Sequence, residues 1–220
     1  MSMSYDEAAY EQAAYEQYME ELYEKHREEA IEEFTFELLR SYYNENKLLA
    51  KPAFDTLSEA RKLNELHSSA GVIFAAIAME TGLKTMLLKP IVHGLVHAES
   101  VASLITDLAV SHTGMDRYRD LLLRVLQEHG GVDLNTFKRI GANKTLWEEI
   151  NEIQKIRNLI MHRAEKATTQ SADLALAVAS EIIDHIFPSV IIKMGFHLHD
   201  GYRICSDWKC SIKQDNQKKL

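Results

Sequence analysis

The chain has 220 residues, enough to bury one hydrophobic core, and its 46% hydrophobic content with 9 glycines and 3 prolines favours a folded, helix-rich protein. No uninterrupted apolar run approaches the ~20 residues that span a bilayer, and the acidic N-terminus lacks the apolar centre of a secretory signal. The net charge of −8 comes from residues 1–37, where twelve acidic residues outnumber two basic ones, and it opposes non-specific binding of polyanions. We therefore expect a cytoplasmic protein with no membrane segment.

Residues 1–50 form an acidic arm that we expect to be one long helix. The arm opens with the repeat "AAYEQ" at 8–12 and again at 13–17, and both alanine and glutamate favour helix. A loose apolar stripe begins only after about residue 20, so the first turns are expected to be solvated or docked on a partner. An acidic arm that shields a basic RNA-binding surface is the open alternative.

Residues 51–194 contain the segments from which we expect a helical bundle. Pro52 marks a break, and "TLSE" at 56–59 fits a capping box that opens a helix running to Pro90. The centre of this run, 72–79, is apolar on every side, which is typical of a buried helix. A further helix is expected over "IVHGLVHAESVASLITDLAV" at 91–110.

Two more helices are expected in the second half of this segment. A second capping box, "TLWE" at 145–148, opens one of them. The last long helix, from residue 171, is expected to continue past Pro188 with a kink. No strand–helix alternation appears in the sequence, so we predict an all-α, up-and-down helical bundle.

The tail, residues 195–220, shows some alternation and is expected to be irregular or to hold a short hairpin. It carries four side chains of the type that bind zinc, His197, His199, Cys205 and Cys210. Their pattern is H-x-H and C-x4-C, and the second spacing is at the loose end of known zinc sites, so we expect no metal there. The pair His93 and His97 is also compatible with a metal, but it lacks an obvious third ligand.

The stretch "QKIRNLIMHRAEKA" at 154–167 has the most unusual placement of charge. At about 100° per residue, Arg157 falls within the apolar stripe of its helix, while Asn158 and His162 share a more polar face. A buried guanidinium must be paired or open onto a cleft, and Glu80 on the apolar helix is available as its partner. Arg157 and His162 diverge by roughly 140°, so a shared site requires either that the helix ends or bends near His162 or that a second protomer completes the site.

These residues resemble the signature of HEPN domains, the higher eukaryote and prokaryote nucleotide-binding superfamily. "IRNLIMHRAE" matches the Arg-polar-x3-His pattern through Arg157, Asn158 and His162, and the alanine-rich run before residue 90 resembles the second helix of such domains, with Glu80 at its frequent glutamate position. The resemblance covers about residues 56–190. It implies a helical bundle that forms a homodimer.

The resemblance also implies a metal-independent endoribonuclease that cleaves single-stranded RNA, without a cofactor, in a toxin–antitoxin or phage-defence system. His162 would transfer a proton, Arg157 would stabilise the phosphorane, and Asn158 would position the phosphate, while the 2′-OH of the RNA attacks. An antitoxin or a regulatory protein is the expected partner. The alternative is a non-catalytic helical dimerisation or interaction module in which Arg157 and Glu80 form a structural ion pair.

Overall fold

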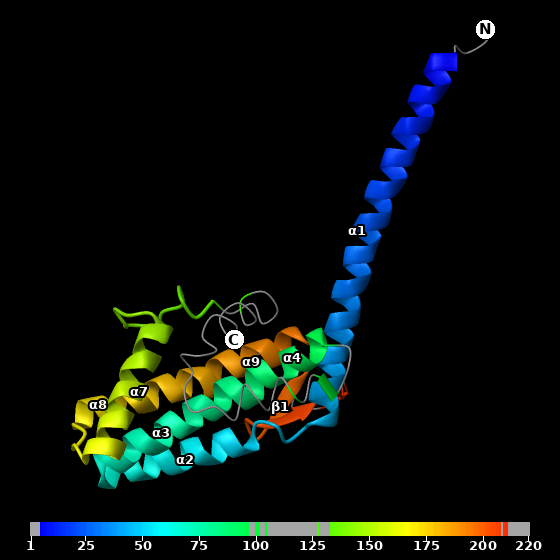
Figure 1. The fold of residues 1–220 in the computed structure, drawn as a ribbon. Helices are drawn as coiled ribbons and strands as arrows, with labels where there is room; N and C mark the ends of the chain where they lie inside the picture. Colours follow the sequence, from blue (N-terminus) through cyan, green and yellow to red (C-terminus); the bar gives the residue numbers. More distant parts are fainter. Residues whose placement is uncertain are drawn as a thin grey trace.

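The computed structural model describes residues 5–96, 133–207 and 209–210, together with residues 100, 101, 104 and 127. The prediction of an all-α bundle is confirmed, and a small two-stranded hairpin accompanies the helices. Figure 1 shows one long helix projecting from the end of the bundle. The helices before the central gap are α1 (Tyr5–Glu45), α2 (Lys51–Leu66), α3 (Ser68–Thr81) and α4 (Lys89–Leu95), and those after it are α7 (Leu146–Arg163), α8 (Thr169–Ser180) and α9 (Phe187–Lys193).

Helix α2 begins earlier than the sequence predicts. It starts at Lys51 with Pro52 in its first turn, where a missing N–H costs nothing. The hydroxyl of Thr56 donates to the carbonyl oxygen of Pro52 over 2.7 Å, so Thr56 lies inside the helix and the predicted capping box at this residue is wrong. His67, with extended backbone at φ −148°, ends α2 and allows α3 to pack beside it. The run that was expected to be one helix is therefore two.

Two long helical rods form the centre of the bundle, and each contains a π-helical segment directly before a proline. Segment η1 (Gly82–Leu88) joins α3 to α4, and segment η3 (Glu181–Ile186) joins α8 to α9. Pro90 and Pro188 each lie in the first turn of the helix that follows. A proline inside an α-helix clashes with the carbonyl four residues earlier, and the wider π turn relieves this clash. Helix therefore continues past Pro188, as predicted, and also past Pro90, which was not.

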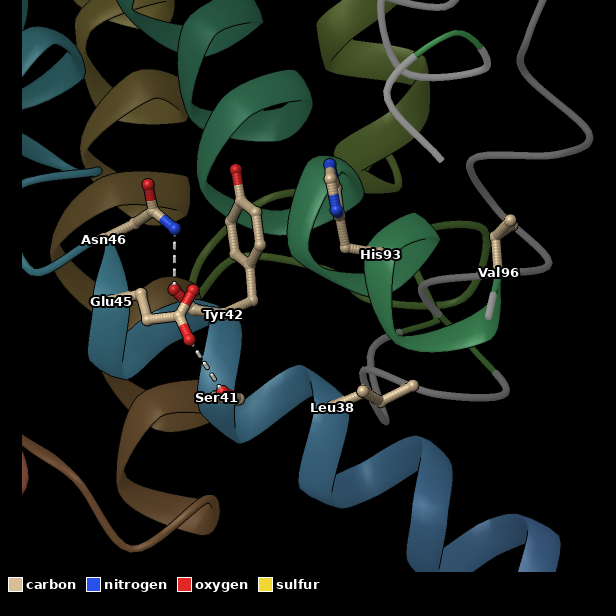
Figure 2. Close-up of a pocket in the computed structure, with 7 residues that line it drawn as sticks. All are labelled: Leu38, Ser41, Tyr42, Glu45, Asn46, His93 and Val96. Carbon is tan, nitrogen blue, oxygen red and sulfur yellow. Dashed lines mark hydrogen bonds between the residues drawn. The ribbon is translucent and has the colours of Figure 1, made fainter. Parts of the chain in front are cut away.

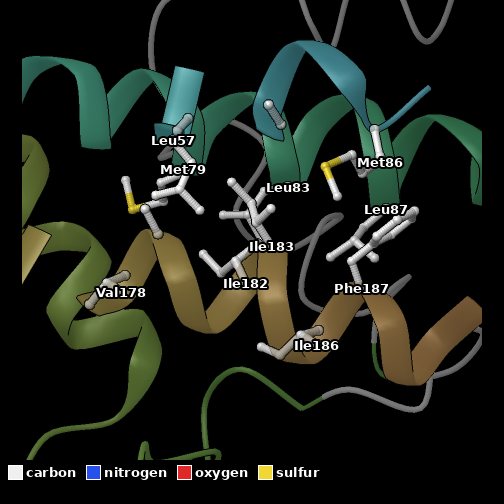
Figure 3. Close-up of a cluster of buried hydrophobic side chains, with 14 of the residues drawn as sticks. Leu57, Met79, Leu83, Met86, Leu87, Val178, Ile182, Ile183, Ile186 and Phe187 are labelled. Atoms are coloured by element: carbon white, nitrogen blue, oxygen red, sulfur yellow. The ribbon is translucent and has the colours of Figure 1, made fainter. Parts of the chain in front are cut away.

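The two rods run side by side in the same direction and bury the core between them (Figure 3). Gly82 permits their close approach, since a Cβ at this position would lie 3.2 Å from the Ile182 side chain. Both rods, Ser68–Leu95 and Thr169–Lys193, are long and apolar enough to cross a membrane by length and composition alone, a test that buried core helices also pass. In the bundle, 61% and 50% of their most apolar windows are buried.

The end of α1 is docked on the first rod. Leu39 and Tyr43 are buried, and a Cβ at Gly94 of α4 would lie 3.1 Å from the carbonyl oxygen of Thr35. The hydroxyl of Tyr43 donates to the carbonyl oxygen of Met86 over 2.9 Å. This contact fixes the direction in which α1 leaves the bundle.

Helix α7 and the tail complete the described structure. Thr145 caps α7 through a capping box with Glu148, which confirms the second predicted capping box. The tail holds the expected hairpin, β1 (His197–His199) paired with β2 (Arg203–Cys205). Residues 91–95 are helical, but most of the following helix predicted from "IVHGLVHAESVASLITDLAV" lies outside the described residues.

Candidate functional site

The Arg157–His162 motif lies at the end of α7 and does not form a closed site within this chain. Arg157 is half-buried, whereas Asn158 and His162 are exposed. The guanidinium of Arg157 donates to the Asn158 side-chain oxygen over 3.4 Å. The helix ends one residue after His162, at Arg163, and Ala164 adopts a left-handed conformation with φ 53°. Arg157 therefore lies on a different face of the helix from Asn158 and His162.

The predicted ion pair between Arg157 and Glu80 is not formed. The Glu80 carboxylate on α3 lies 3.9 Å from the Lys84 ammonium group, one helical turn away. Among the residues that the structure describes, no carboxylate is within ion-pair distance of Arg157. Glu80 pairs with Lys84 and not with Arg157 because residues four apart on a helix are already close neighbours.

The buried ion pair of the described structure is instead formed by Arg139 and Glu149. The guanidinium binds both carboxylate oxygens, each over 2.8 Å, and Glu149 is only 5% exposed. The hydrogen bond to Glu149 is the main reason why the pKa of Arg139 is raised above its usual value. Sequence analysis missed this pair, although Glu149 lies only about 60° from Leu146 on the apolar stripe of α7. This ion pair holds residues 133–145 against the bundle. Its guanidinium and its carboxylate bind each other, so we assign neither a catalytic role.

A pocket of about 600 Å³ lies where α1 meets α4 (Figure 2). The rings of Tyr42 and His93 lie 4.5 Å apart along its wall, and burial raises the pKa of Tyr42. Among the described residues that line it, the one carboxylate is that of Glu45, which accepts a hydrogen bond from Ser41 over 3.1 Å. The predicted partner of His93, His97, lies outside the described residues.

The four candidate zinc ligands of the tail converge. His197 pairs with Cys205 across the hairpin, and His199 lies two residues from His197, so all three side chains are on one face. A further turn of the backbone brings the side chain of Cys210 next to these three. The four candidate ligand atoms all lie within 4.8 Å of one another.

The outer part of α1 carries a stripe of large exposed side chains. Tyr15, Tyr18, Met19 and Tyr23 are 63%, 59%, 43% and 68% exposed. Their spacing of three and four residues places them within an arc of about 140° on one side of the helix. We call these four residues the aromatic stripe.

A similarity to a known protein covers most of the chain. No family model matches the chain, and no solved structure matches it closely. The chain is 27% identical over 167 residues to a protein named ATP synthase subunit delta from Brevibacillus brevis (strain 47 / JCM 6285 / NBRC 100599). This similarity covers 70% of the present chain and 89% of that protein.

This finding corrects the functional prediction. The similar protein is named as a subunit of ATP synthase and not as a nuclease, which contradicts the prediction of an endoribonuclease in a toxin–antitoxin or defence system. The predicted RNA substrate and antitoxin partner are wrong for the same reason. The resemblance to HEPN domains, and the assignment of Arg157, Asn158 and His162 to one site, stay predictions.

Proposed function

We propose that the chain is a non-catalytic helical subunit of a protein assembly, and that the aromatic stripe of α1 is its docking surface. The partner we infer is a different protein, with an apolar groove flanked by lysine and arginine side chains.

The exposure of α1 carries this proposal. A helix of 41 residues is about 60 Å long, and among the described residues only its last turns are packed against the bundle. Figure 1 shows the remainder extending away from the other helices. Large apolar side chains at i, i+3, i+4 and i+8 are the anchors with which an amphipathic helix binds a groove. Tyrosine is also among the residues that contribute most to binding energy at protein interfaces.

Charge indicates the chemistry of the groove. Glu16, Glu20 and Glu21 border the aromatic stripe, and residues 1–37 as a whole have twelve acidic and two basic side chains. A basic rim on the partner would steer the acidic helix into place and would make association slower at high salt.

The similarity to ATP synthase subunit delta supports a role in an assembly, because that name describes one subunit of a larger complex. ATP synthase is therefore the first assembly to test as the partner.

The test uses a photo-crosslinking amino acid placed at Tyr18 of the full-length protein in its native cells. The matched control carries it at Gln17, which lies about 100° from Tyr18 round the same helix and outside the arc of the aromatic stripe. We expect one partner protein to be crosslinked from Tyr18 and not from Gln17, and the crosslinked residue to lie in an apolar groove with a basic rim.

The purified partner then allows the interface to be measured. The double substitution Tyr18→Ala and Tyr23→Ala should weaken binding by about 10-fold or more, since interface tyrosines often contribute over 1 kcal/mol each. Equal crosslinking from Tyr18 and Gln17, or crosslinks only between copies of this chain, would overturn the proposal.

A further inference from the structure

We propose that His197, His199, Cys205 and Cys210 bind one structural zinc ion. The proposal rests on the geometry of the tail and is independent of the function proposed for α1.

Two of the distances between the candidate ligands match those of a tetrahedral zinc site. The Nε2 atoms of His197 and His199 lie 3.2 Å apart, and the Sγ atom of Cys210 lies 3.3 Å from Nε2 of His199. With zinc–nitrogen bonds of about 2.0–2.1 Å and zinc–sulfur bonds of about 2.3 Å, tetrahedral ligands lie about 3.3–3.8 Å apart. The largest separation in the cluster, 4.8 Å, exceeds this by about 1 Å, which side-chain rotation can close.

Two turns of the backbone bring these ligands together. Asp200 and Gly201 have φ of 53° and 80°, the positive values that a tight hairpin turn needs, and this turn places His199 next to β2. A second turn returns the chain to the site, since the backbone N–H of Cys210 donates to the carbonyl oxygen of Asp207 over 3.2 Å. A side-chain oxygen of Asp207 also accepts from the N–H of Lys209 over 2.9 Å.

The site is partly enclosed, which favours a structural ion. His197 is only 4% exposed, and the other three ligands are half-buried. On the opposite face of the hairpin, Leu198 and Ile204 pack into the core. Two nitrogen and two sulfur ligands complete a tetrahedron and leave no open position for a substrate, and this ligand set selects zinc over magnesium or calcium.

The ion would fasten the tail to the root of α1. The N–H of Ile204 donates to the carbonyl oxygen of Lys47, which follows α1, over 2.9 Å. The hydroxyl of Ser206 donates to the side-chain oxygen of Asn44 over 2.9 Å. Closing the segment between Cys205 and Cys210 with a metal would hold both contacts in place.

The experiment measures metal in the untagged full-length protein, purified under reducing conditions from zinc-supplemented medium. Elemental analysis should find one zinc per chain in the wild type, and less than about 0.1 in Cys205→Ser and Cys210→Ser. His185→Ala removes an exposed histidine elsewhere and should keep the zinc. Cys210→His retains a ligand and should restore binding that Cys210→Ser abolishes.

Cobalt replacement tests the geometry without any variant, so a variant that fails to fold does not weaken the test. The cobalt-loaded wild type should show the intense visible bands of a tetrahedral site and the ultraviolet absorption of thiolate bound to cobalt. A zinc-free wild type, an octahedral cobalt spectrum, full zinc content in both cysteine variants, or a disulfide between Cys205 and Cys210 in freshly isolated protein would overturn the proposal.

Discussion

The hydroxyl of Tyr43 on α1 donates to the carbonyl oxygen of Met86 over 2.9 Å. Met86 lies in the π-helical segment η1, four residues before Pro90, where the hydrogen bonds of the regular α-helix are interrupted. The side chain of one helix thus supplies a donor to the interrupted turn of another. The same contact fixes the root of the projecting helix.

Removing the hydroxyl of Tyr43 should destabilise the protein. We expect Tyr43→Phe to lower the free energy of unfolding by about 1–2 kcal/mol, because a buried hydrogen bond is lost while the ring packing is kept. Tyr42→Phe changes the neighbouring, less buried tyrosine and serves as the control, with an expected effect below about 0.5 kcal/mol. Denaturant unfolding measures both, and equal effects of the two substitutions would contradict the role of Tyr43.

Tyr43 should also make the fold sensitive to alkaline pH. Burial, and to a smaller extent the charge of Tyr42, raises the pKa of Tyr43 above its ordinary value of 10.0. The contribution of Tyr43 to stability is therefore fully present below pH 10.0 and is lost as the pH rises towards the folded-state pKa, since the unfolded chain releases the proton more readily. Unfolding measured from neutral pH to about pH 11 should show this loss in the wild type and less of it in Tyr43→Phe.

Removing only one charge of the Arg139–Glu149 ion pair should lower the free energy of unfolding more than removing both charges. Glu149→Gln leaves the guanidinium of Arg139 partly buried without its counter-charge, and we expect a loss of about 3 kcal/mol. Replacing both residues, Arg139→Met with Glu149→Leu, should restore most of this stability because no buried charge remains. Thermal unfolding of the three variants checks the prediction, which fails if the double variant is less stable than Glu149→Gln.

The cap of α7 should respond to acid. The backbone N–H and the hydroxyl of Thr145 bind the Glu148 carboxylate and lower its pKa. The stability that this carboxylate supplies is present above its ordinary pKa of 4.5 and is lost as the pH falls through the lowered folded-state pKa. Glu148→Gln should therefore reduce the loss of unfolding free energy that accompanies acidification, measured by unfolding between about pH 6 and pH 2. Glu152→Gln, on the same helix but outside the cap, should leave the contribution of Glu148 unchanged.

A non-catalytic subunit should leave RNA intact. We expect no cleavage of single-stranded RNA by the full-length protein in EDTA, because Arg157 and His162 remain on separate faces of α7. Gel analysis of a labelled RNA checks this, with Arg157→Ala as the matched control. Cleavage by the wild type that Arg157→Ala abolishes would contradict the non-catalytic proposal.

Local signals in the sequence predicted much of this fold. The acidic arm, the capping box at Thr145, the long last helix and the hairpin of the tail all follow from propensities and hydrogen bonds between residues close in the chain. The predicted helix start at Thr56 failed because its capping pattern competed with Pro52, which is better suited to a first turn.

The sites depended on contacts between distant residues. The apolar placement of Arg157 and Glu80 made them look like partners, but Lys84 in η1 pairs with Glu80 instead. Arg139 pairs with Glu149 across a turn that helical periodicity does not describe. The C-x4-C spacing is at the loose end of known zinc sites, so the sequence did not predict a metal. Two backbone turns nevertheless bring the four side chains together.

The sequence by itself determined that this is an all-α protein with a charged helical arm, because helix propensity and apolar periodicity act within a few residues. Only the tertiary structure decided which helices share the core, that the aromatic stripe of α1 stays uncovered by the described bundle, and that the tail gathers two histidines and two cysteines. These outcomes depend on contacts between residues that are far apart in the sequence. Local sequence patterns do not determine those contacts.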